Sequence, residues 1–140
     1  MQEAILVAGL PGSGKTRLGK RLAEEKGYLL LDDISTLSDD ANTFLQQFHT
    51  ATGLVITDPM FCYGKVRDQA TEVIRKVFPT ATQTWIFFEN DPKQCLLNAT
   101  RRSEHKPVSL FIDDVSKEYS PPDNATLIPV YRHAPASPLA

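Results

Sequence analysis

Residues 9–16 spell GLPGSGKT and satisfy every fixed position of the phosphate-binding pattern G-x-x-x-x-G-K-[ST]. The apolar run Ala4–Ala8 comes directly before this segment, and a stretch of helical character, residues 17–26, follows it. That succession of strand, glycine-rich loop and helix is the context in which the pattern holds phosphate. The chain is thereby restricted to folds in which a buried strand leads through a tight loop into the N-terminus of a helix.

The residue types of this loop predict its chemistry. Glycines let the backbone wrap closely round an oligophosphate, so that successive N–H groups point inward, and the start of the helix adds positive potential. Lys15 is expected to reach the β- and γ-phosphates, and the Thr16 hydroxyl to ligate Mg²⁺. A glycine turn of purely structural purpose would not require Lys and Thr after its last glycine. We therefore expect ATP and Mg²⁺ as cofactors, with the nucleotide bound by Gly9, Gly12, Ser13, Gly14, Lys15 and Thr16.

Strand-like apolar runs alternate with helical patterns along the rest of the chain. Runs of strand type lie at residues 28–31, 54–56, 84–88 and 126–131, the last as 126–128 with 130–131. Helical patterns follow the phosphate loop and lie around residues 44–48, at 66–77, from 92 onward and at 110–119. This alternation predicts an α/β fold: a doubly wound, five-stranded parallel sheet of order 2-3-1-4-5 with helices on both faces.

Two of the expected helices show which face they bury. The helix at 66–77 has one apolar face, made by Val66, Ala70, Val73, Ile74 and Val77. Asp91 and Pro92 suit the N-cap and the first position of the next helix, whose inner face should carry Leu96 and Ala99.

Size, charge and cysteine content indicate an ordinary globular domain. The 140 residues can bury roughly two-thirds of their unfolded surface in one core. The net charge of −2 gives no overall basic field for holding nucleic acid non-specifically. It does not exclude a local basic groove. Cys62 and Cys95 lie on apolar segments without metal-ligand spacing, and are interpreted as reduced core residues. With no signal peptide and no apolar run near ~20 residues, we expect a cytoplasmic protein without a membrane partner.

Carboxylates follow three of the expected strands, at the edge where doubly wound sheets bind ligands. Asp32 and Asp33 come after the second strand, Asp58 after the third, and Glu89 and Asp91 after the fourth. Phosphoryl transfer needs a carboxylate near the acceptor hydroxyl to take its proton, and often another near Mg²⁺. The Asp32–Asp33 pair is interpreted as functional rather than as a turn. Asp58 is either a magnesium ligand, a substrate-binding carboxylate or a turn aspartate before Pro59.

A basic cluster at residues 101–106 lies between the last two expected helices. In a nucleotide-binding domain such a turn can close over the phosphates as a lid and stabilise charge in the transition state. Cations at a helix C-terminus also interact favourably with the helix dipole, and the same residues can serve both roles.

The order of these elements resembles the small P-loop kinase family typified by the polynucleotide 5′-hydroxyl kinases. The resemblance extends from Ala4 to about Tyr131 and includes the phosphate loop, the paired aspartates, the strand ending at Asp58 and the helix that starts at Asp91. The segment Tyr119-Ser-Pro121-Pro122 looks like the Tyr-x-x-Pro signature before the last strand of these kinases. Residues 1–134 are expected to form the P-loop kinase domain, and residues 135–140, which are small and proline-rich, a tail that frays.

The resemblance also implies roles for individual residues. Asp32 would be the general base toward the acceptor hydroxyl. Asp33 is expected to bind the substrate, or to be the base itself if the end of the strand is shifted by one residue. Asp58 would contact the acceptor or its phosphate. Arg102 would be the lid arginine at the β- and γ-phosphates.

The sequence departs from the family at two positions. Ser35 stands where the family usually has an arginine that grips the acceptor's phosphate, and Asn98 stands where it often has another arginine, one turn before the lid.

An ATP-dependent kinase acting on an acceptor hydroxyl is the leading hypothesis, and the acceptor stays open between a polynucleotide 5′ end and a nucleoside or other small molecule. The alternative is a nucleotide-dependent switch that hydrolyses ATP slowly and acts through a protein partner. The paired aspartates argue against the switch, which would need a residue that positions water. The guanine-specifying Asn-Lys-x-Asp of GTPases does not occur, which favours ATP over GTP.

Overall fold

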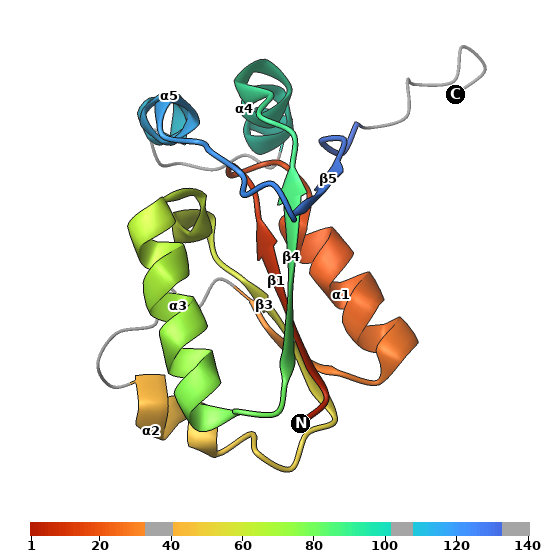
Figure 1. The fold of residues 1–140 in the computed structure, drawn as a ribbon. Coiled ribbons are helices and arrows are strands. Elements are labelled where there is room, and N and C mark those ends of the chain that lie inside the picture. Colours follow the sequence, from red (N-terminus) through yellow and green to blue (C-terminus); the bar gives the residue numbers. More distant parts are fainter. Residues whose placement is uncertain (33–40, 102–107, 133–140) are drawn as a thin grey trace, which may run out of the picture.

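The computed structural model describes residues 1–32, 41–101 and 108–132, and is built on one parallel sheet (Figure 1). Its strands lie in the order β2-β3-β1-β4-β5, and every neighbouring pair is parallel. Their bounds are Glu3–Ala8 for β1, Leu29–Leu31 for β2, Gly53–Thr57 for β3, Thr82–Phe88 for β4 and Thr126–Ile128 for β5. The predicted fold class and strand order are confirmed.

Helices connect the strands and cover both faces of the sheet. Helix α1 lies on one face, and α2 and α3 lie on the other, while α4 and α5 lie together beyond the carboxyl end of β4 (Figure 1). The helices span Lys15–Lys26 (α1), Ala41–Gln46 (α2), Gly64–Val77 (α3), Pro92–Arg101 (α4) and Val108–Lys117 (α5), with a 3₁₀ helix, η1, at Pro59–Cys62. None of the helices in the described ranges is long and apolar enough to cross a membrane.

The first strand supplies both halves of the core, because successive side chains of a strand point to opposite faces. Ala4, Leu6 and Ala8 pack with the core on the α3 side, where the predicted inner residues of α3 also lie. Ile5 and Val7 pack with the core that includes Ala23 of α1. Residues 4–8 are therefore buried on both sides, as the continuous apolar run predicts.

One predicted detail of α4 is wrong. Leu96 was expected on the inner face, but 39% of its surface is exposed, whereas Cys95, Asn98 and Ala99 are buried. These three share one face at the spacing of a helix turn. A polar side chain, Asn98, takes the inward position for which a purely apolar pattern selects Leu96.

Two smaller features of the predicted elements are clear in the structure. Residues 130–131 do not continue the last strand, because β5 ends at Ile128. Cys62 and Cys95 are both free and buried, in agreement with their interpretation as core residues.

Candidate functional site

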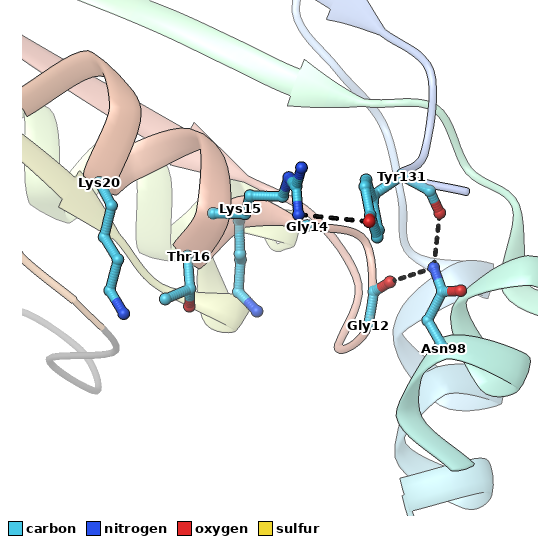
Figure 2. A pocket seen from close by; sticks show the side chains of 8 residues that line it. Gly12, Gly14, Lys15, Thr16, Lys20, Asn98 and Tyr131 are labelled. Atoms are coloured by element: carbon cyan, nitrogen blue, oxygen red, sulfur yellow. Dashed lines mark hydrogen bonds between the residues drawn. The ribbon is translucent and has the colours of Figure 1, made fainter. Parts of the chain in front are cut away.

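The phosphate loop joins β1 to α1 and is tightly packed on two sides (Figure 2). Gly12 and Gly14 have φ angles of 85° and 105°, a backbone region that side chains other than glycine rarely adopt. A Cβ atom on Gly12 would strike the carbonyl of Cys95 in α4, and one on Gly14 would lie 2.8 Å from Cβ of Tyr131. The loop conformation is therefore available only to these glycines.

A cavity of about 350 Å³ opens on the loop, and its charged residues are all cations (Figure 2). Lys15, the first residue of α1, is only 6% exposed. The full lining is Gly12, Gly14, Lys15, Thr16, Arg17, Lys20, Asn98 and Tyr131. Three cations beside a helix N-terminus make this cavity suited to an anion such as an oligophosphate.

A second, larger cavity of about 630 Å³ continues from the first along α1 toward β5. The two share Gly14, Arg17, Lys20 and Tyr131. At their junction the Arg17 guanidinium lies 4.3 Å from the centre of the Tyr131 ring, and its Nη1 donates to the tyrosine hydroxyl at 3.2 Å. The lining of the larger cavity adds the apolar residues Leu18, Phe88, Ile128 and Pro129 and the charged residues Arg21 and Glu24.

Asp32 lies at the end of β2 and brings three elements together. The Thr16 hydroxyl of α1 donates to both of its carboxylate oxygens, at 2.9 and 3.2 Å. The Thr57 hydroxyl, at the end of β3, donates to Oδ1 at 2.5 Å. The predicted magnesium ligand and the predicted base are thus direct neighbours. In the described part of the chain, no three His, Cys, Asp or Glu side chains gather where they could hold a metal ion.

Asp58 is fully buried directly after β3. Its Oδ1 accepts a hydrogen bond from the Met60 N–H at 2.9 Å, so that it caps η1, with Pro59 in the first turn. This is the turn role that the sequence left open. Its contact with an acceptor stays a prediction.

The other predicted site residues have different outcomes. Asp33 and Arg102 lie outside the described residues. Asp91 caps α4 as predicted, because its Oδ1 accepts from the Gln94 N–H at 3.2 Å.

Sequence reasoning missed the roles of Asn98, Arg17 and Tyr131 around the loop. The Asn98 side-chain amide, 4% exposed, donates to the carbonyl oxygens of Gly12 at 2.8 Å and of Tyr131 at 2.6 Å (Figure 2). The available signal was a polar residue on the same helical face as Cys95 and Ala99. Its partners are distant in sequence, so their identity could not be read from spacing.

Two buried thiols lie within electrostatic reach of Lys15. Burial raises the pKa of Cys62 to about 12, and the nearby charges of Lys15 and Arg67 only partly oppose it. Burial likewise raises the pKa of Cys95 to about 12, with Asp91 adding to the shift and Lys15 opposing it. Neither thiol is therefore a nucleophile at neutral pH.

No family model matches the chain. One curated relative, "Uncharacterized protein R277" of Acanthamoeba polyphaga mimivirus, is 30% identical over 128 residues, an alignment that covers 84% of this chain and 86% of the viral protein. The chain belongs to the family of this viral protein. The alignment covers most of both proteins.

Solved structures that resemble this chain include kinases and nucleotide-bound proteins. A gluconokinase from Sinorhizobium meliloti 1021 has a TM-score of 0.64 at 19% identity, covering 98% of this chain and 85% of that chain. Kti12 from Chaetomium thermophilum, in complex with ADP-AlF3, has a TM-score of 0.60 at 18% identity, covering 90% and 88%. The Mycobacterium tuberculosis APS kinase CysC, in complex with AMPPNP and APS, has a TM-score of 0.50 at 20% identity, covering 94% and 90%. The fold is that of the P-loop kinases.

Proposed function

We propose that the chain is an ATP-dependent phosphotransferase that moves the γ-phosphoryl group to an acceptor hydroxyl. The observation that carries this proposal is the meeting of the phosphate loop with a carboxylate: Thr16, next to Lys15, donates to Asp32 at the carboxyl edge of the sheet. A nucleotide site and a base would then lie side by side. The fold shared with a gluconokinase and an APS kinase supports the same reaction class.

The oxygen atoms around Thr16 fit a magnesium ion. Hydroxyl and carboxylate oxygens are the ligands this hard cation prefers, and it usually takes the rest of its shell from phosphates and water. Thr16 would hold the ion directly, with Asp32 beside it. When bound, Mg²⁺ neutralises charge on the β- and γ-phosphates.

The transfer itself is assigned to three residues. The acceptor oxygen loses its proton to the Asp32 carboxylate as it forms a bond to the γ-phosphorus, and the bond from that phosphorus to the β–γ bridging oxygen breaks to release ADP. Lys15 and Arg102 compensate the negative charge on the transferring group. Asp33 and Asp58 would contact the acceptor.

A small-molecule hydroxyl is the favoured acceptor. The polynucleotide kinases often use an arginine at the position of Asn98, whereas both donor contacts of the Asn98 amide are taken by backbone carbonyls. A grip on a nucleic-acid phosphate would therefore need other residues. The folds of gluconokinase and shikimate kinase, both named for small acceptors, support the same choice. A polynucleotide 5′-hydroxyl is the second candidate, because the order of the motifs along the sequence resembles that of the polynucleotide kinases.

Transfer of labelled γ-phosphate from ATP-Mg²⁺ to a panel of acceptors tests the proposal. The panel contains sugars and sugar acids, other small alcohols, nucleosides, nucleotides, and 5′-hydroxyl RNA and DNA oligonucleotides. Label on a small acceptor is the expected result. Label on a 5′ end alone would reassign the acceptor and keep the chemistry. No transfer, with ATP hydrolysis appearing only when a protein partner is added, would replace the kinase with a nucleotide-dependent switch.

A further inference from the structure

Two neighbouring peptide groups of the phosphate loop are held from outside the loop. The carbonyl of Gly12 accepts from Asn98, and the N–H at the other end of the same peptide, on Ser13, donates to the Leu10 carbonyl at 3.0 Å. The next carbonyl, that of Ser13, accepts from the Tyr131 N–H at 2.9 Å. The carbonyls on either side of residue 13 are thus bound to α4 and to the segment after β5.

The direction of these carbonyls decides what the loop presents to a ligand. A peptide group is planar and trans, so its N–H points opposite to its C=O. When Tyr131 holds the Ser13 carbonyl, the Gly14 N–H on the same peptide must point to the other side of the loop. An anion is bound by inward N–H groups and repelled by inward carbonyls. The outward hydrogen bonds therefore set the polarity of the loop.

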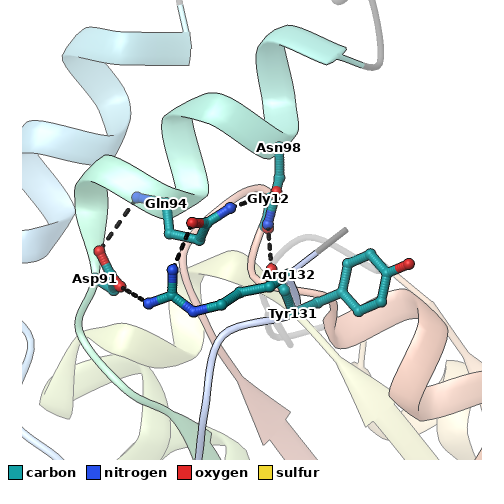
Figure 3. A network of polar contacts seen from close by, with 6 residues as sticks. All are labelled: Gly12, Asp91, Gln94, Asn98, Tyr131 and Arg132. Atoms are coloured by element: carbon teal, nitrogen blue, oxygen red, sulfur yellow. Dashed lines mark hydrogen bonds and ion pairs between the residues drawn. The ribbon is translucent and has the colours of Figure 1, made fainter. Parts of the chain in front are cut away.

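Asn98 is the centre of this arrangement. Its Nδ2 group donates to Gly12 and to Tyr131, which joins α4, the loop and the segment after β5 through one side chain (Figure 3). Two acceptor carbonyls require two N–H donors, which an amide has and a carboxylate lacks. Asn98 is only 4% exposed, so water cannot readily replace these hydrogen bonds.

The Asn98 amide is itself oriented by a chain of polar contacts (Figure 3). Its Oδ1 accepts from Gln94 Nε2 at 3.0 Å, and Gln94 Oε1 accepts from Arg132 Nη1 at 2.8 Å. Arg132 Nη2 then meets Asp91 Oδ2 at 3.1 Å. With its oxygen occupied by Gln94, the amide keeps its nitrogen toward the two carbonyls.

We infer that Asn98 is a positioning residue for phosphate binding: it holds the Gly12 and Tyr131 carbonyls so that the phosphate loop is preformed for the nucleotide. This role rests on the proposed nucleotide site, and the polynucleotide kinases often have an arginine, not an asparagine, at this position. Asn98 need not touch the ligand. It acts on the oligophosphate part of the ligand through the loop, and not on the base.

The test compares Asn98→Asp with Asn90→Asp by calorimetric titration of ADP-Mg²⁺ and of Mg²⁺-tripolyphosphate, which lacks a base. Asn98→Asp puts a carboxylate against two carbonyls, and both dissociation constants should rise by about tenfold or more and by similar factors, because the loss of buried donors is costly. Asn90 is exposed near the start of α4, undergoes the same change in charge and should leave both constants unchanged. In the transfer assay, KM for ATP should rise more than kcat falls.

Asn98→Ala serves as the second variant, because it removes the donors without adding charge. If Asn98→Asp shows no cooperative thermal unfolding, the alanine variant decides, with both constants expected to rise by about fivefold or more. Dissociation constants within twofold of wild type in the folded variant would overturn the role of Asn98. So would a loss confined to ADP. A wild-type chain that binds neither probe would overturn the proposed function together with this role.

Discussion

The donor side of the site is made largely of backbone groups of the phosphate loop, whereas the acceptor side is formed by side chains at strand ends. On the donor side, the carbonyls of Gly12 and Ser13 and the N–H of Ser13 all have fixed partners. On the acceptor side, the exposed Asp32 carboxylate is held by two threonine hydroxyls. A backbone cradle recognises any oligophosphate, while side chains at strand ends can change from one family to another. The same fold can therefore keep its donor and change its acceptor.

The largest effect is expected from Lys15→Ala, on the donor side. Turnover should fall by about 10³-fold or more, because charge that develops on the transferring group loses its compensation. Steady-state transfer to the acceptor identified in the panel measures this. The matched control is Lys26→Ala at the other end of α1, exposed and far along the helix from the loop, which should stay within about twofold of wild type. Near-normal turnover of Lys15→Ala would contradict the assigned donor site.

Asp32→Asn tests where the donor side ends and the acceptor side begins. Transfer should fall by about 10²- to 10⁴-fold, because the base is lost, while the dissociation constant of ATP-Mg²⁺ stays near wild type. An amide oxygen can still accept from Thr16 or Thr57. Single-turnover transfer and calorimetric titration give the two quantities.

A different pattern in Asp32→Asn would move the boundary between the two sides. If ATP-Mg²⁺ affinity falls together with transfer, Asp32 belongs to the magnesium shell, and Asp33 becomes the candidate base. Asp68→Asn on the exposed side of α3 is the control for loss of a carboxylate, and should change neither quantity.

The same contrast explains how far the sequence could predict the molecule. The loop and the strand order depend on residues that are contiguous or periodic, so pattern and spacing were sufficient. The hydrogen bond from Asn98 to the Gly12 carbonyl joins positions 86 residues apart, and no local sequence pattern predicts such a contact. The wrong placement of Leu96 has the same cause, because apolar periodicity gives no weight to a polar residue that is buried by its hydrogen bonds.

The acceptor side shows the limit from another direction. The sequence did not distinguish a capping role from a ligand-binding role for Asp58, because an aspartate before a proline is compatible with both. The structure shows the capping role, because Asp58 accepts a hydrogen bond from the Met60 N–H. Its contact with an acceptor stays a prediction.

Substitutions at Asp58 separate these two roles. Asp58→Ala removes the cap of η1 and should lower the free energy of unfolding by about 1 kcal/mol, measured by urea denaturation. Asp58→Asn keeps a good capping oxygen and should retain most of that stability. If Asp58 contacts the acceptor through its charge, the asparagine variant raises KM for the acceptor in the transfer assay. An unchanged KM would leave Asp58 with its capping role alone.

Cys62 and Cys95 are expected to contribute least to catalysis, because neither buried thiol is a nucleophile at neutral pH. Their burial can be tested by their reactivity and by the pH dependence of stability. Because burial raises the pKa values of Cys62 and Cys95 to about 12, the folded protein should be alkylated at pH 8 about 10³-fold more slowly than the urea-unfolded chain. The folded state holds protons that the unfolded chain releases near pH 9, so stability should fall as the pH rises from about 9 to about 12. Urea midpoints at pH 8 and pH 10 measure this fall, and replacing both cysteines with alanine should reduce it. Rapid alkylation of the folded protein would instead mean that the core beside the donor site opens to solvent, and that the loop is less rigidly held than its hydrogen bonds indicate.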